Sequence, residues 1–476
     1  MEERTEKAAA MAGDSRTPGA RVPALALDSA ASPRRFSAHV AWTLSARLLM
    51  AVNSIIAGVI VARWLGAGGL GRLMVINVAV ATVVQLGSLG LPSANTYFIS
   101  HDRRHLATAA FNSLVFALCG GALLGAGLAG LAALYPAWFG LEGPRLLAVA
   151  AVSIPFQLLT LLGLNIFLAL GRVALFNLID LAGQSLTLLG ALLALVLARA
   201  GLLALVSLNT AGAVMLALFI VWLTYGSLKR REERASLRPS RGLFRQMLRY
   251  GLKAHVTVVA AMLIFRADLL IVQYFRGAEE AGVYGVATQG ATLLMLLPAV
   301  MSTLLLPRVA ALGAEGQQEE LTSIVTRHTA FMMALVCLAA IPASFALPWL
   351  YGRPFGDAPV QFLLLLPGVY FISIESVLVQ YFNGTGLPAA IPWFWVATLL
   401  ANVLLNLAWV PAYGARGAAC ASALCYTMIF LLVAVYFRVR TGRRASGFLV
   451  LRARELRALL ALVPSGMQAG RVSADE

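Results

Sequence analysis

Five charged side chains stand out because each lies inside a long apolar stretch of the sequence. Two are basic and three are acidic: Arg47, Arg266, Asp180, Asp268 and Glu375. Ionised side chains in apolar surroundings cost several kcal/mol, so they usually face a partner or a polar cavity. Two arginines in one cavity would attract an anion, and a carboxyl group beside them could bind a proton or a sodium ion. The alternative is that these charges form salt bridges between helices and contact no substrate.

Uncharged polar residues accompany the charges at helical spacing. Asn53 follows Arg47 by close to two helical turns. Asp180 lies three residues after Asn177 and four before Gln184, so a helix places all three on one face. These spacings indicate polar helix faces inside an otherwise apolar bundle.

Arg266 and Asp268 cannot form one simple ion pair with each other. They are two residues apart, which separates them by about 200° around a helix, so at least one must face another helix or a cavity. We predict a cationic cavity for an anionic substrate, with an acid that couples an ion. The substrate-binding candidates are Arg47, Arg266, Asn53 and Gln85, and the ion-coupling candidates are Asp180, Asp268 and Glu375.

The composition indicates that membrane helices must position these residues. Apolar residues make up 60% of the 476 and charged residues 12%, whereas soluble domains average about 45–50% and about 25%. The mean hydropathy of +0.82 excludes a water-soluble globular protein. A membrane helix needs about 20 apolar residues, and we predict twelve in an all-α polytopic bundle. They lie near 40–65, 71–99, 106–134, 146–170, 173–198, 201–225, 252–275, 281–306, 324–350, 358–383, 389–411 and 414–437.

Basic residues mark one side of the predicted bundle. The chain has 37 Lys and Arg against 21 Asp and Glu, a net charge of +16. About 28 of the 37 fall in the N-terminal arm, the even-numbered connections and the C-terminal tail. Because basic loops stay in the cytoplasm, this asymmetry predicts that both termini are cytoplasmic. It also argues against a nucleic-acid partner, since the charge follows the topology.

Two sets of six stretches on either side of a basic segment indicate an internal duplication. Trp64-Leu65-Gly66-Ala67 with Gly71 corresponds to Phe275-Arg276-Gly277-Ala278 with Gly282, 211 residues later. Twofold helical repeats are common in transporters, with the substrate path between the repeats. We predict a disordered cytoplasmic arm over 1–39, an N-lobe over 40–226, a basic cytoplasmic linker over 227–251, a C-lobe over 252–438 and a cytoplasmic tail over 439–476.

The linker and the tail each contain a segment that resembles a surface helix. Arg241, Arg245 and Arg249 recur every four residues, with apolar residues elsewhere around the helix. Such a helix lies on the cytoplasmic membrane surface and binds anionic lipid. The segment 448–463 has the same character, and we expect both to dock on anionic lipid.

Several strings resemble one transporter family. The most specific is Val410-Pro411-Ala412-Tyr413-Gly414-Ala415-Arg416-Gly417-Ala418-Ala419. Others are Arg63-Trp64-Leu65-Gly66, Gly90-Leu91-Pro92, Asn383-Gly384-Thr385-Gly386, Asn402-Val403-Leu404-Leu405-Asn406, and Phe265-Arg266-Ala267-Asp268-Leu269-Leu270-Ile271 running to Gly282-Val283-Tyr284-Gly285-Val286-Ala287. Over residues 40–438 the chain is similar to the polysaccharide-transporter family, the Wzx-like oligosaccharide flippases of the MOP superfamily.

The resemblance implies two six-helix lobes in a V that work by alternating access. It also implies a substrate: an oligosaccharide repeat unit linked to undecaprenyl pyrophosphate, flipped across a bacterial cytoplasmic membrane for O-antigen, exopolysaccharide or capsule synthesis. A diphosphate headgroup would suit the two arginines. Further implied partners are H⁺ or Na⁺, and polysaccharide polymerase or assembly proteins.

Two other functions remain open at this point. A MATE-like drug or metabolite exporter would share the fold, but two intramembrane arginines disfavour its cationic substrates. A membrane-embedded polysaccharide polymerase or ligase would need catalytic groups on a substantial outer loop, whereas the odd-numbered connections are short. No metal-ligand spacing or nucleophile–base pair occurs in the sequence, so we predict neither an enzyme nor a cofactor.

Overall fold

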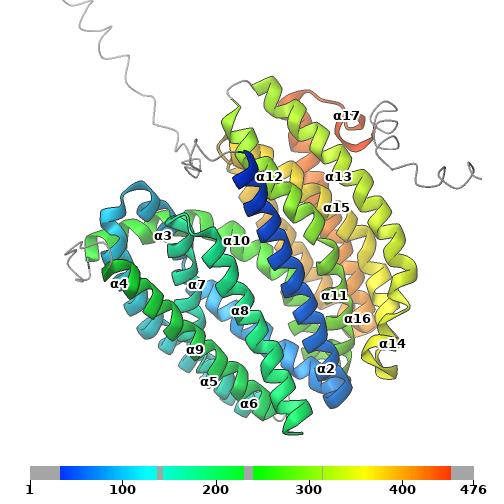
Figure 1. The fold of residues 1–476 in the computed structure, drawn as a ribbon. Coiled ribbons are helices and arrows are strands. Elements are labelled where there is room, and N and C mark those ends of the chain that lie inside the picture. The colour runs from blue at the N-terminus through cyan, green and yellow to red at the C-terminus, as the bar shows by residue number, and fades with distance from the viewer. Residues whose placement is uncertain (1–32, 137–142, 230–239, 313–314, 452–476) are drawn as a thin grey trace, which may run out of the picture.

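A computed structural model of the chain describes residues 33–136, 143–229, 240–312 and 315–451 (Figure 1). Every regular element in these ranges is helical. The α-helices of the first half are α2 (Pro33–Gly87), α3 (Leu91–His101), α4 (Leu106–Val115), α5 (Gly121–Leu134), α6 (Gly143–Ala151), α7 (Ile154–Ala169), α8 (Val173–Ala191) and α9 (Leu202–Lys229). Those of the second half are α10 (Arg241–Arg276), α11 (Ala278–Leu294), α12 (Leu296–Ala311), α13 (Glu315–Ser344), α14 (Leu347–Tyr351), α15 (Ala358–Thr385), α16 (Ala390–Thr441) and α17 (Ser446–Leu449). Short 3₁₀- or π-helical turns join some of them: η1 (Arg103–His105), η2 (Phe116–Gly120), η4 (Leu192–Leu197) and η5 (Arg353–Phe355).

When the two kinked helices are each divided in two, the described residues offer twelve candidate spans. Nine continuous helical segments are long and apolar enough to cross a membrane. Two of them, α2 and α16, each contain two helices that meet at a kink, at Gly66 and Gly414. The pair α6 and α7, bent by 40°, supplies one more span. The polytopic all-α prediction is therefore confirmed.

The spans form two lobes (Figure 1). The helices α3 to α9 pack as one bundle and α11 to α16 as another, and α2 runs between them to contact both α8 and α11. Fully buried leucines such as Leu158 and Leu162 fill the core of the first lobe. Large side chains such as Phe437 fill the second. The core of the first lobe also includes side chains of the second half, such as Val283, Val286 and Phe355, so apolar contacts join the two lobes.

Three connections between spans consist of a single glycine followed by alanine. Gly66 has φ 69° and ψ −176°, and Gly277 has φ 85° and ψ 178°. Gly414 has φ 61° and ψ −145°. Positive φ is accessible to glycine at little steric cost, so each span reverses without a loop. We call the end of the bundle that holds these glycines the outer end, following the orientation predicted from the basic residues.

The two repeated glycine strings pack against each other at the outer end. A Cβ atom on Gly71 would overlap the carbonyl oxygen of Ala278, and a Cβ atom on Gly282 would overlap that of Ala67. Each lobe therefore presents the same small-residue surface to the other, and the backbones approach closely as small residues permit. The two strings that correspond in the sequence, 211 residues apart, therefore contact each other with approximate twofold symmetry.

Some predicted boundaries differ from the observed ones. α2 already begins at Pro33, inside the arm predicted as disordered over 1–39, of which residues 1–32 lie outside the described residues. The second span is interrupted at 88–90, where Gly90 has φ 73°. The ninth ends at Ser344, and α14 follows as a separate short helix.

The basic segment of the linker is not a separate surface helix. It forms the first turns of α10, which continues unbroken into the seventh span. Leu243 and Met247 are buried in the core of the first lobe, and Phe244 packs on Phe116 with ring centroids 5.7 Å apart. The apolar face thus packs on protein rather than on lipid, because α10 starts beneath the first lobe before it joins the second.

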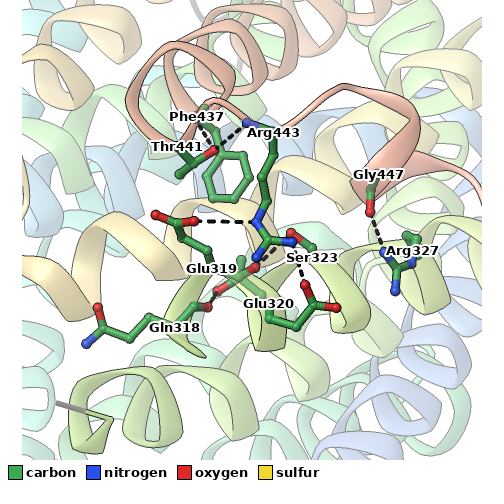
Figure 2. Close-up of polar contacts among 10 residues, drawn as sticks. Gln318, Glu319, Glu320, Ser323, Arg327, Phe437, Thr441, Arg443 and Gly447 are labelled. Carbon is green, nitrogen blue, oxygen red and sulfur yellow. Dashed lines mark hydrogen bonds and ion pairs between the residues drawn. The ribbon is translucent and has the colours of Figure 1, made fainter. Parts of the chain in front are cut away.

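The segment after the twelfth span folds back onto α13 (Figure 2). Arg443 forms ion pairs with Glu319 at 3.4 Å and with Glu320 at 2.5 Å. Phe448 of α17 is buried against Phe437, with ring centroids 5.3 Å apart. We call these contacts the C-terminal staple. The remainder of the predicted amphipathic tail segment, from residue 452, lies outside the described residues.

A buried arginine holds the same segment from the other side (Figure 2). Arg327 of α13 has no exposed surface, and its guanidinium donates a hydrogen bond to the carbonyl oxygen of Gly447. A buried guanidinium needs such acceptors, since an unpaired charge in an apolar interior is costly.

Candidate functional site

A polar seam joins α2 to α8 along the first lobe. Asn177 Nδ2 donates to Thr43 Oγ1 at 2.8 Å, and about three turns further along Asn53 Nδ2 donates to Ser185 Oγ at 3.0 Å. These two hydrogen bonds hold α2 and α8 in register along their lengths. This seam includes the face of α8 that the sequence predicts to be polar.

Arg47 and Asp180 lie on this seam, between the two hydrogen bonds. The charges of the guanidinium and the carboxylate interact with each other. Arg47 is nevertheless exposed, whereas Asp180 is half-buried.

A polar cavity of about 120 Å³ lies at the outer end of the seam. Asn53, a substrate-binding candidate from the sequence, lines it. The Oδ1 atom of Asn209 is buried there without a hydrogen-bond partner among the described residues. The remaining polar side chains in its wall are Ser54, Asn77, Gln184, Thr187 and Gln289.

Gln289 of α11 closes this cavity from the opposite lobe. Its Nε2 donates to Ser54 Oγ at 2.9 Å, and its Oε1 accepts from the Tyr351 hydroxyl at 3.3 Å. A Cβ atom on Gly58 would lie 3.2 Å from Gln289 Oε1, so the glycine makes room for the amide. Neither Gln289 nor Asn77 was predicted from the sequence, because each shows there only as a lone amide within an apolar span.

Arg266 and Asp268 face opposite sides of α10, as their spacing requires. Asp268 is buried in the second lobe, where its Oδ2 accepts hydrogen bonds from the Tyr284 hydroxyl at 2.5 Å and from Ser422 Oγ at 2.9 Å. Its Oδ1 accepts from the backbone N–H of Leu269 at 2.8 Å. Arg266 is exposed on the other face.

Glu375 and Gln85 lie apart from the seam. Glu375 is buried in α15, and its Oε1 has no hydrogen-bond partner among the described residues. Gln85 occupies the last turn before the break in the second span, and its carbonyl oxygen accepts from Ser88. The fold therefore brings Arg47, Asn53 and Asp180 together and separates Asp268, Glu375 and Gln85 from them. Among the described residues no group of three or more His, Cys, Asp or Glu could hold a metal ion.

A family model described as "Polysaccharide biosynthesis protein" matches residues 36–313. The matched range includes the whole seam, the cavity and the contact between the two glycine strings. The chain belongs to this family. Its membership agrees with the resemblance to polysaccharide transporters that the sequence strings indicate.

Known relatives of this family member are named as flippases and transporters. A protein of Haloferax volcanii named "Probable low-salt glycan biosynthesis flippase Agl15" is 24% identical over 235 residues, 47% of this chain and 48% of the relative. The chain thus matches about half the length of that relative. This relative and a second one of the same organism, 26% identical over 171 residues, are named as flippases and not as enzymes.

Two solved structures share the fold. The lipid II flippase MurJ, in an inward closed conformation, has a TM-score of 0.67 at 15% identity and covers 84% of this chain and 87% of its own. An inward-facing multidrug resistance MATE transporter of the MOP superfamily has a TM-score of 0.65 at 14% identity and covers 84% and 98%. The two-lobe MOP fold is therefore confirmed for the chain.

Proposed function

We propose that the protein flips a lipid-linked oligosaccharide across the cytoplasmic membrane. The observation that carries the proposal is the pair of exposed arginines, Arg47 and Arg266, on the apolar spans α2 and α10. Both helices contact the opposite lobe as well as their own. A charged side chain on a membrane span costs free energy unless it lines a water-filled path. The substrate class follows from membership of a polysaccharide biosynthesis family.

The chemistry of the two arginines suits a diphosphate linkage. Guanidinium groups bind phosphate oxygens through two parallel hydrogen bonds and stay charged at every physiological pH. A polyisoprenyl pyrophosphate, such as undecaprenyl pyrophosphate, carries that anion between an apolar tail and a glycan. The amide-rich cavity beside Arg47 offers donors and acceptors for sugar hydroxyls.

We assign the coupling role to Asp180 among the three candidate acids. Asp180 is the acid whose charge interacts with Arg47, so its protonation would release the guanidinium for phosphate. Asp268 already accepts three hydrogen bonds, which supports a structural role. Glu375 lies in a buried site away from the seam and remains a second candidate for proton binding.

Alternating access would use the contact at the outer end as its closed gate. With the basic connections in the cytoplasm, both termini lie inside and the packed glycine strings seal the external side. The two solved structures, one inward closed and one inward-facing, share this fold. We place the protein in a bacterial inner membrane, where O-antigen or exopolysaccharide units are exported. Polymerase and assembly proteins would act on the product there.

The test is export of lipid-linked glycan by arginine variants in a deletion strain. We expect Arg47→Ala and Arg266→Ala to insert normally but to abolish surface polysaccharide, and Asp180→Asn to export at a reduced rate. Arg199→Ala, at an exposed outer turn, is the matched control and should export normally. Surface polysaccharide at the wild-type level in both arginine variants would refute the proposed site.

The competing function is export of amphiphilic cations, which the likeness to a MATE structure favours. The test of that function is gradient-driven efflux of a cationic dye. Efflux by the wild-type protein and by both arginine variants, together with its loss in Asp180→Asn, would support cation export instead. The two arginines on the seam and on α10 argue against it.

A further inference from the structure

An apolar cavity of about 210 Å³ opens on the side of the first lobe. Its floor is α7, which packs on both α4 and α9. Side chains of Leu114, Leu159 and Ile220 belong to the lining, and no charged residue does. Gly163 contributes to its depth, because a Cβ atom there would overlap Ile220. The cavity is distinct from the polar cavity of the proposed substrate site.

Two exposed arginines flank the inner end of this cavity. Arg172, in the turn between α7 and α8, donates from Nη1 to Ser227 Oγ at 2.9 Å, one residue before Leu228 of the lining. Arg241 directly follows Ser240, whose backbone exchanges hydrogen bonds of 3.3 Å with the side chain of Asn112. Asn112 lies between two residues of the lining, Phe111 and Ser113.

The position of the cavity corresponds to the inner leaflet of the membrane. α4 begins and α9 ends at the basic side of the bundle, and the lining falls within residues 110–114 of α4 and 220–228 of α9. Tyr225, on its edge, exposes 59% of its surface, as an aromatic side chain at the membrane interface does. An acyl chain lying in the cavity would place its headgroup level with both arginines.

We propose that this cavity is a binding site for one anionic phospholipid of the cytoplasmic leaflet. One acyl chain fills the apolar cavity, and the phosphate lies between Arg172 and Arg241. Basic groups near the surface attract anionic lipid, and the absence of any charged side chain in the lining suits a hydrocarbon chain. The bound lipid would tie the first turn of α10 to α4 and α9. This proposal goes beyond the flippase function and holds whatever the transported substrate is.

The test is lipid retention by purified protein in native mass spectrometry with phosphatidylglycerol and phosphatidylcholine as probes. We expect wild-type protein to retain one phosphatidylglycerol in preference to phosphatidylcholine. Combining Arg172→Gln with Arg241→Gln should weaken phosphatidylglycerol retention roughly 25-fold, because each basic group favours anionic lipid by roughly fivefold. Ala110→Leu, which fills the cavity, should weaken retention of both lipids.

Matched controls separate this site from general lipid binding. Arg199→Gln removes one charge at the outer end, and Ala133→Leu adds the same side chain on an exposed face of α5; both should behave as wild type. Equal retention of the two lipids by wild type, or equal retention by the double variant and Arg199→Gln, would overturn the proposal. Displacement of phosphatidylglycerol by a tenfold lower concentration of undecaprenyl phosphate would also overturn it, since the cavity would then hold the carrier lipid.

Discussion

The charges within the spans differ in how far their neighbours satisfy them. Asp268 receives two hydroxyl hydrogen bonds and one from the backbone, which compensates the loss of hydration. Arg47 has an acid beside it but keeps exposed donors. A charged residue whose hydrogen-bonding groups are all paired within the protein holds a lobe together. One whose donors stay exposed can bind a substrate. This distinction guides the assignment of roles among the intramembrane charges.

We predict that Asp268→Asn destabilises the second lobe without affecting its insertion. The amide nitrogen cannot accept the bond from Tyr284 or Ser422, and leaving buried groups unpaired costs about 1–3 kcal/mol. The melting temperature of purified protein should fall, with a smaller fall for Ser422→Ala. Asp357→Asn is the control because that acid is exposed in a surface ion pair with Arg416. Equal melting temperatures for Asp268→Asn and the control would contradict the structural role.

At the scale of elements, the C-terminal staple fixes the end of α16 to the start of α13. Its stability should come mainly from the buried ring of Phe448, which packs on Phe437. The ion pairs of Arg443 are partly exposed, with 26% of that side chain accessible, and surface pairs contribute only about 0–1 kcal/mol. The apolar contact should therefore outweigh the ionic one.

We predict that Phe448→Ala lowers the melting temperature more than Arg443→Ala does. Truncating a buried phenylalanine typically costs about 3–5 kcal/mol, although relaxation of the short α17 will reduce this. The melting temperature in detergent at low and high salt separates the two effects, because salt screens the ion pairs of Arg443 but not the packing of Phe448. A larger loss for Arg443→Ala would show that charge holds the segment.

At the scale of the whole molecule, the two repeated glycine strings pack against each other at the outer end, where we propose that they form the closed gate. The twofold contact of Gly71 and Gly282 leaves no space for a side chain, because each faces the backbone of the other lobe. Any side chain there must separate the lobes by its own width. A conformation closed at this end should consequently depend on both glycines.

We predict that Gly71→Ala and Gly282→Ala open the outer end and reduce export. A cysteine introduced at Asn77, in the wall of the polar cavity, should react faster with an impermeant maleimide in these variants. Gly68→Ala is the matched control, because nothing lies within 4 Å of a Cβ atom at that position. The cysteine-free background must be used, since Cys119 is exposed. Equal labelling in the control and in both variants would refute the gate.

Much of the architecture could be predicted from the sequence because its determinants are local. Twelve apolar stretches are each long enough to span a membrane, and the basic residues that flank them follow the topology. Single glycines before alanine mark the tight turns at Gly66, Gly277 and Gly414, since positive φ suits glycine. The boundary errors occurred at Pro33 and Arg241, where helices continue past the apolar stretch that revealed them.

The partners of the polar residues could not be predicted in this way. Asp268 meets Ser422, 154 residues away, and Gln289 meets Ser54 across the lobes. Such contacts depend on the rotation of each helix and on the packing of neighbours distant in the chain. The sequence alone thus determined the spans and which charges lie within them, because hydrophobicity acts locally. Only the tertiary structure decided which of those charges are satisfied and which stay exposed, because that depends on contacts between helices.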